Sequence, residues 1–191
     1  MGNEVKGVWF VSARRYLAET GQEDVARRMI ERLDEPHRAT FASPAPSDWY
    51  PEATLAETLR MLREETGAAR DERFVALMQA ITHVGINRFF RLVLSVSSAD
   101  FVLRKIPVMW GHIRRGAGKV SVETGDRGAT IRYSEFPWFD EPTYRLMTEG
   151  SIRALLAAVD VSADVRVGSF TRSSLLVNVT YRNRPSGRPP A

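Results

Sequence analysis

The spacing of apolar residues changes once along the chain, from a helical period to a strand period. In the first part, apolar side chains recur every three or four positions, as Leu55, Leu59 and Leu62 do. In the last third they alternate with polar residues, which is the pattern of strands with one buried face. The pattern predicts a helical block over about residues 6–116 and a part that contains a sheet over about residues 119–182.

Five helices are predicted in the helical block. They are one that Ser12 caps and Gly21 ends, one over residues 23–33, one that begins at Trp49-Tyr50-Pro51 and ends at Thr66, one over residues 71–96, and one from Ser98 to Arg115. The helix over residues 71–96 has the widest apolar surface, so we expect it at the centre of the block. Pro107 lies inside the fifth and predicts a kink, because proline lacks an amide donor and clashes with the preceding turn.

Two strands, a helix and two further strands are predicted after the helical block. Gly125-Asp126-Arg127-Gly128 forms the turn of the first hairpin, and a helix is expected over Thr143–Val159. Alternation around Val165 and again around Val177 indicates the last two strands. The predicted fold class is therefore α+β, with a helical block followed by a β-β-α-β-β unit that holds a four-stranded antiparallel sheet.

Composition indicates an ordinary globular protein. Of the 191 residues, 43% are hydrophobic and 26% are charged. We expect a single domain over residues 1–183 and a disordered tail over residues 184–191, which lacks apolar anchors. The sequence has no cysteine, which excludes disulfides, thiolate nucleophiles and cysteine-ligated metal centres. It shows neither a signal peptide nor the apolar run of about 20 residues that a membrane span needs, so we expect a cytoplasmic protein.

The positive charge of the chain does not by itself indicate nucleic-acid binding. The net charge is +4 and the pI is about 9.7, but the arginines are spread along the chain and interleaved with acidic residues. Residues 24–32 carry both signs, which is typical of a solvated helix face. Arg114-Arg115 ends a predicted helix, where the helix dipole favours cations. We therefore expect no nucleic-acid partner.

No catalytic or metal-binding motif is found in the sequence. His37, His83 and His112 lie far apart, without the paired spacing that metal ligands need. Neither a Gly-x-Ser-x-Gly motif nor a phosphate-binding glycine loop is present. Glu135 and Glu141 precede the helix that crosses the sheet, and its dipole explains acidic residues there. We expect no enzymatic activity and no bound metal.

Three short motifs carry a family resemblance. The Lys6-Gly7 opening, the Trp49-Tyr50-Pro51 segment and the helix from Phe101 to Trp110 resemble a domain family of unknown function that occurs as many paralogues in myxobacteria. The resemblance covers the chain from Lys6 to about Arg182. That family is distantly similar to haem–nitric-oxide-binding (H-NOX) domains and to vinyl-4-reductase-type ligand-binding domains. The resemblance implies a pocket for haem or an apolar small molecule between the helices and the sheet.

The haem-binding pattern of those domains is not matched. H-NOX domains resemble one another in a tyrosine-x-serine-x-arginine triplet that holds the haem propionates, whereas this chain has Tyr133-Ser134-Glu135-Phe136-Pro137. The serine stands one position early, and no arginine follows at the required spacing. The axial histidine would lie on the helix from Ser98 to Arg115, where His112 is close to the C-terminal end. We therefore expect neither haem nor another cofactor.

Six residues on two helices are the predicted ligand-binding residues, and their alternative role is plain core packing. They are Ile106, Met109, Trp110, Leu146, Met147 and Gly150. Methionine suits a cavity that must adapt to its contents. Glycine inside a helix costs about 1 kcal/mol relative to alanine and persists where a backbone or a ligand must come close.

These observations predict a non-enzymatic sensor or adaptor domain that binds a small apolar molecule, without haem, in a pocket between helices and sheet. The alternative is a protein-interaction or homodimerisation module with a filled core and no ligand. An apolar ligand and a protein partner or second copy are therefore the two kinds of partner that the sequence indicates.

Overall fold

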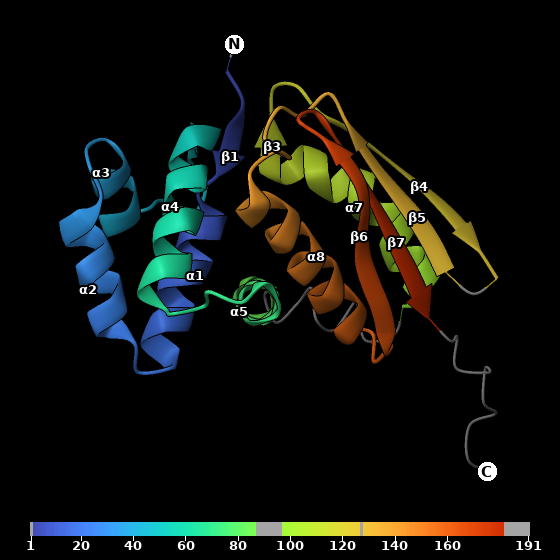
Figure 1. The fold of residues 1–191 in the computed structure, drawn as a ribbon, viewed down its shortest axis with the longest axis horizontal. Helices are drawn as coiled ribbons and strands as arrows, with labels where there is room; N and C mark the ends of the chain where they lie inside the picture. Colours follow the sequence, from blue (N-terminus) through green and yellow to red (C-terminus); the bar gives the residue numbers. More distant parts are fainter. Residues whose placement is uncertain (1, 87–96, 127, 182–191) are drawn as a thin grey trace.

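The computed structural model describes residues 2–86, 97–126 and 128–181, which form a helical half and a half built on a sheet (Figure 1). The helices are α1 (Val8–Glu19), α2 (Glu23–Arg32), α3 (His37–Ala42), α4 (Glu52–Glu65), α5 (Asp71–Gly85), α7 (Ala99–Ile113) and α8 (Pro142–Ala157). The strands are β1 (Glu4–Lys6), β2 (Trp49–Pro51), β3 (Arg114–Arg115), β4 (Lys119–Gly125), β5 (Gly128–Ser134), β6 (Ala163–Thr171) and β7 (Ser174–Tyr181). The predicted α+β class and the β-β-α-β-β order are confirmed.

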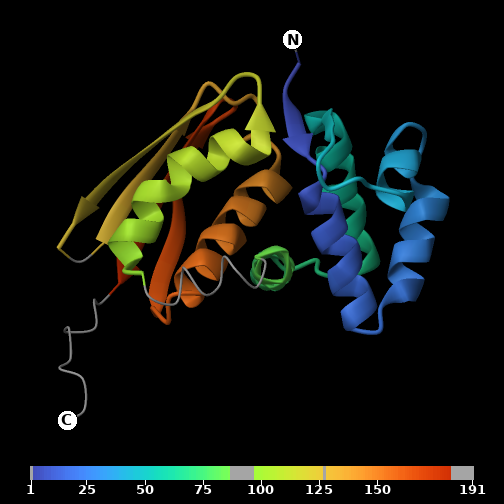
Figure 2. The same cartoon turned by 180° about the vertical axis from the view of Figure 1, so that it is seen from behind.

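The larger sheet has four antiparallel strands in the order β4-β5-β7-β6. Its buried face carries the apolar positions of the predicted alternation, and Ile131 pairs across the sheet with Val122 on one side and Val177 on the other. Figure 2 shows α7 and α8 against this one face of the sheet. The sheet is therefore one layer, α7 and α8 are the second, and α5 lies between them and the helical half.

A second sheet, which the sequence did not predict, joins the two halves. Its strands are in the order β2-β1-β3, and Val5 pairs with both Tyr50 and Arg114. The prediction that Trp49-Tyr50-Pro51 forms the first turn of a helix is wrong, because these residues are strand β2 and α4 begins at Glu52. Proline is tolerated here because β2 is an edge strand of this sheet.

Two helix boundaries also differ from the predictions. Ser12 does not cap α1, which begins four residues earlier at Val8; the Ser12 hydroxyl donates instead to the Val8 carbonyl, at 2.7 Å. The short apolar run before Ser12 is the first turn of this helix, and Phe10 is buried there. The predicted helix over residues 71–96 is observed as α5 up to Gly85, and residues 87–96 lie outside the described part of the chain.

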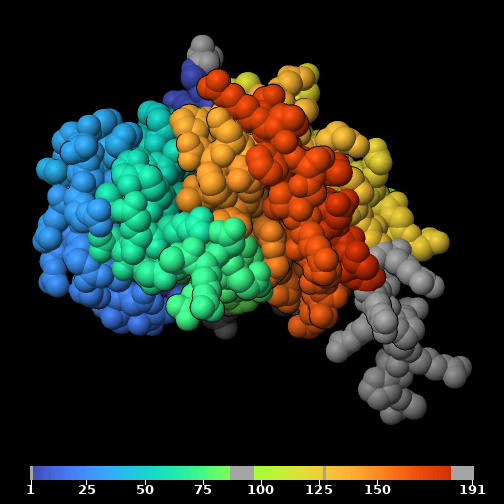
Figure 3. All heavy atoms as spheres, viewed as in Figure 1, coloured from blue at the N-terminus to red at the C-terminus, as the bar shows by residue number. Residues whose placement is uncertain are grey.

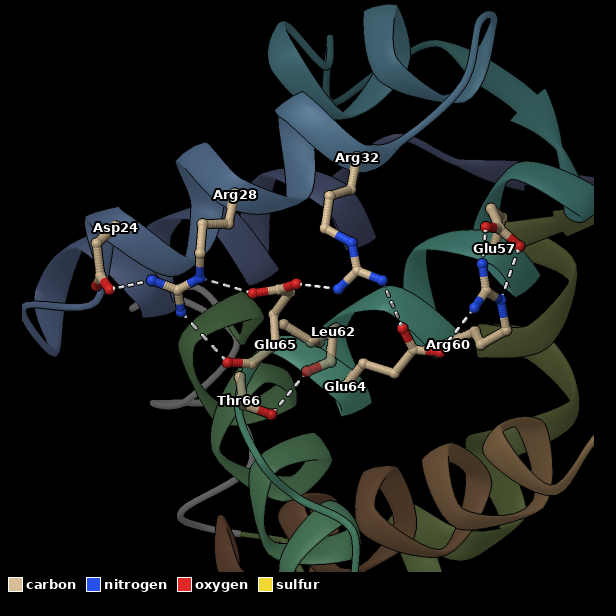
Figure 4. Close-up of polar contacts among 9 residues, drawn as sticks. All are labelled: Asp24, Arg28, Arg32, Glu57, Arg60, Leu62, Glu64, Glu65 and Thr66. Carbon is tan, nitrogen blue, oxygen red and sulfur yellow. Dashed lines mark hydrogen bonds and ion pairs between the residues drawn. The ribbon is translucent and has the colours of Figure 1, made fainter.

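Helices α2 and α4 are held together by ion pairs as well as by apolar contacts (Figure 4). Arg28 and Arg32 of α2 both bind the carboxylate of Glu65 on α4, Arg28 through its Nε at 2.7 Å. Arg28 and, second to it, Arg32 hold the pKa of Glu65 below its usual range. Some of the charged residues over 24–32 thus bind another helix, whereas the sequence predicted only a solvated helix face there.

No helix in the described ranges is both long and apolar enough to cross a lipid bilayer.

Candidate functional site

The six predicted ligand-binding residues do not share one environment. Ile106, Met147 and Gly150 are buried, whereas Met109, Trp110 and Leu146 are half-buried. Leu146 lines a surface hollow, Trp110 joins an aromatic cluster, and Gly150 contacts α5. The structure therefore does not bring all six to one cavity among the described residues.

Gly150 lets α8 approach the backbone of α5. A Cβ at this position would lie 2.6 Å from the Val75 carbonyl oxygen, 2.7 Å from Met78 Cβ and 2.9 Å from the Gln79 amide nitrogen. One turn further along α5, the hydroxyls of Thr82 and Ser151 are 3.1 Å apart. The close approach that the sequence predicted at Gly150 is thus made by a neighbouring helix.

An aromatic cluster fills the space between the C-terminal end of α7, strand β5 and the start of α8. The ring of Trp110 lies 5.0 Å from that of Phe136 and 5.4 Å from that of Tyr133. From Phe136 the cluster continues to Phe139 and, separately, to Tyr144. Burial raises the pKa of Tyr133, so its phenol stays neutral. These contacts are edge-on or tilted, the arrangement that aromatic quadrupoles favour in a packed core.

Next to this cluster lies a group of three buried polar residues, Glu52, Arg114 and Tyr144, which we name the buried joint. The Arg114 Nε donates to Glu52 Oε1 at 3.2 Å, and the Tyr144 hydroxyl lies 3.1 Å from the same oxygen and 2.9 Å from the Glu52 carbonyl oxygen. The side chain of Glu52 is 1% exposed and that of Arg114 is 7% exposed. A charge pair this deeply buried is uncommon, since both ions lose most of their hydration.

The surroundings of the joint orient the guanidinium group. Arg114 lies over the ring of Trp110, with 4.4 Å to its centroid, and over that of Phe136, with 5.4 Å to its centroid. Burial first, and then the carboxylate of Glu52, raises the pKa of Tyr144 well above its usual value, so the phenol remains a hydrogen-bond donor. Glu52 Oε2 and Asn3 Nδ2 are buried and have no hydrogen-bond partner among the residues that the structure describes.

This joint has no signal in the sequence. Taken alone, Arg114 is a cation at a helix C-terminus, and Glu52 is an ordinary acidic residue in a first helical turn. Each interpretation is locally sufficient. Only the pairing of β1 with β2 and β3, which brings residues 52 and 114 together, shows that the two charges meet.

A hollow of about 590 Å³ lies where α5, α8 and β6 meet, on the face that Figure 3 shows. Leu146 and Val75 are among its apolar lining residues. Among its charged lining residues, Arg153 binds Glu149 at 2.6 Å and Glu72 at 2.7 Å. Burial raises the pKa of Glu149, with Arg153 opposing the shift. Apolar and charged residues thus line the hollow together, and the charged ones are the more numerous.

The histidines are placed away from the interior of the sheet half. His112 is exposed on α7, and it follows the fully buried Leu103 by nine residues, which is a rotation of about 180° on a helix. His83 is exposed on α5, and the Nδ1 of His37 lies 3.0 Å from the Thr54 hydroxyl in the helical half. Within the described ranges, no group of three or more His, Asp or Glu side chains could hold a metal ion.

No protein-family model matches the chain, and no curated protein sequence is similar to it.

Solved structures of H-NOX proteins are similar to the chain over nearly its whole length. The Fe(II) unliganded H-NOX protein from K. algicida is 10% identical, covers 96% of this chain and 100% of its own, and has a TM-score of 0.70. An H-NOX protein from S. oneidensis in the Fe(II)NO state is 12% identical, with 93% and 99% covered and a TM-score of 0.69. A mutant of the T. tengcongensis H-NOX protein is 15% identical, with 93% and 95% covered and a TM-score of 0.63.

This similarity shows that the chain has an H-NOX-like fold, as the family resemblance implied. The described residues do not fit the haem of those proteins. The one histidine on α7 points away from the interior, and aromatic side chains occupy the space beside Tyr133.

Proposed function

We propose that this chain is a haem-independent sensor or adaptor domain with the H-NOX-like fold and without enzymatic activity. The orientation of His112 carries the proposal. The axial ligand of a haem must point into the interior of the fold. The side of α7 that faces the interior carries Leu103, and His112 lies on the opposite side of the helix. The sequence supplies no cysteine, and its two other histidines lie on α3 and α5.

Haem titration tests the proposal. Hemin is added to the pure full chain and to the K. algicida H-NOX protein as a positive control, and the Soret band is recorded. We expect a stoichiometric band with the control only. A stoichiometric band that the His112→Ala variant of this chain loses would overturn the proposal.

A protein partner is the kind of ligand that the geometry favours. The predicted interior pocket is occupied by protein contacts at Trp110 and Gly150. Three of the four large apolar side chains that are exposed in the described residues lie on α7, namely Phe101, Val108 and Ile113. Phe101 and Val108 are seven residues apart, so they share one side of the helix. Grouped apolar exposure of this kind supports a protein-contact surface.

A small apolar molecule is the second candidate, supported by the hollow that Leu146 lines. Its volume of about 590 Å³ is in the range of small-molecule sites, and its mixed lining of apolar and charged residues suits an amphipathic ligand.

Native mass spectrometry of the full chain, purified from its own host, distinguishes a partner mode, in which a protein binds, from a ligand mode, in which a small molecule binds. A protein adduct that is lost in a variant with Phe101→Ser and Val108→Ser supports the partner mode. A small adduct that is lost in Leu146→Arg, and kept in the first variant, supports the ligand mode. A bare monomer in every sample contradicts both.

A further inference from the structure

Elements from both halves of the molecule end at the buried joint. Glu52 is the first residue of α4, Arg114 directly follows α7, and Tyr144 is in the first turn of α8. Strand β1 arrives there too, since the Glu52 amide donates to the carbonyl of Asn3 at 2.9 Å. The joint therefore links the helical half to both helices that cover the sheet.

The composition of the joint is unfavourable for stability alone. Buried ion pairs are often no more stabilising than apolar side chains of the same size, because both charges lose their water. Here the pair has one direct contact, and Glu52 Oε2 has no partner among the described residues. Such a pair does strongly disfavour any arrangement in which the two charges separate while they remain buried. It is suited to fixing geometry.

We propose that the Glu52–Arg114 pair transmits the position of α7 to α4. The stacking of Arg114 on Trp110 ties the guanidinium to the last turn of α7, and its contact with Glu52 ties it to the first turn of α4. A shift or rotation of α7 therefore carries the first turn of α4 with it, because the alternative leaves two unpaired buried charges. The inference does not depend on which molecule acts on α7, so it stands apart from the choice between partner and ligand.

The test perturbs α7 and reads out α4 in two backgrounds. Pro107→Ala restores an amide donor within α7, two turns before Arg114. Amide chemical shifts of Glu52–Leu55 are measured by NMR in the full chain. The perturbation is then repeated in a neutral background, in which Glu52→Gln and Arg114→Met remove both charges together.

We expect Pro107→Ala to shift the α4 resonances in the native background, and we expect that response to fall by about half or more in the neutral one. The matched control background, Lys119→Met with Glu135→Gln, removes a surface pair with 72% and 58% exposed side chains and should keep the full response. If the neutral background does not fold, Arg114→Lys takes its place, since it keeps the charge but loses the planar group.

Two results would overturn the inference. One is an equal response in the native and neutral backgrounds, which would assign the transmission to the paired backbones of β1 and β3. The other is no response of α4 in the native background.

Discussion

The carbonyl oxygen of Val75 lies 2.6 Å from the point that a Cβ on Gly150 would occupy. Alanine at position 150 must therefore push α8 away from α5. We expect Gly150→Ala to lower the free energy of unfolding by about 1–3 kcal/mol, the usual cost of overpacking, despite the better helix propensity of alanine. Urea unfolding followed by circular dichroism measures this change.

Gly111 on α7 is the matched control, because it is also inside a helix but a Cβ there meets nothing within 4 Å. We expect Gly111→Ala to raise the free energy of unfolding by up to about 1 kcal/mol. Equal effects of the two substitutions would contradict the close packing of α5 and α8.

Tyr144 contributes the neutral hydrogen bond of the buried joint. Its hydroxyl lies 3.1 Å from Glu52 Oε1, and burial keeps it protonated by raising its pKa. Tyr144→Phe removes the donor and leaves the carboxylate with the Arg114 contact alone. We expect a loss of about 1.5–3 kcal/mol in the free energy of unfolding, as for hydrogen bonds to charged groups. A loss within measurement error would mean that the carboxylate finds another donor.

The depressed pKa of Glu65 makes the packing of α2 on α4 sensitive to acid. Arg28 and Arg32 lower this pKa in the folded state, so ionised Glu65 stabilises the fold at neutral pH. The contribution is present above the unfolded pKa and is lost as pH falls through the folded value. We expect Glu65→Gln to be less stable than the native chain at pH 7, with the difference shrinking toward pH 3. Unfolding curves at several pH values measure it, and a constant difference would contradict the shift.

Glu149 should change the free energy of unfolding with pH in the direction opposite to that of Glu65. Burial raises its pKa, so the folded state holds the proton more tightly than the unfolded state does. Ionisation of Glu149 therefore costs stability as pH rises through the unfolded pKa of about 4.3. We expect the stability of Glu149→Gln relative to the native chain to increase between pH 4 and pH 7. The same unfolding series tests this, and parallel pH curves for the two Glu→Gln variants would rule it out.

The sequence predicted those parts of the fold that depend on local periodicity. Alternating positions such as Ile131 and Val177 identified the strands, because each strand of a sheet with one buried face repeats that pattern on its own. The late position of His112 on its helix, from which the sequence argues against haem, also follows from the helical pattern alone. These conclusions need no knowledge of which elements are neighbours.

The buried joint could not be predicted, because it depends on tertiary pairing. Strands β1, β2 and β3 have only two or three residues each, too few to show a period. Glu52 and Arg114 each look like a terminal helix charge, and nothing in the sequence indicates that they meet. The close approach at Gly150 was predicted, but its partner could be named only once α5 was seen beside α8.

The placement of β1 between β2 and β3 also bears on how the chain is made. Val5 pairs with Tyr50 and with Arg114, which is synthesised about a hundred residues later. A ribosome that has completed only the helical half has therefore produced a first strand with one of its two neighbours. The pairing of β1 with β3 can therefore form only after α7 has left the exit tunnel, so this small sheet cannot be completed while only the helical half is present.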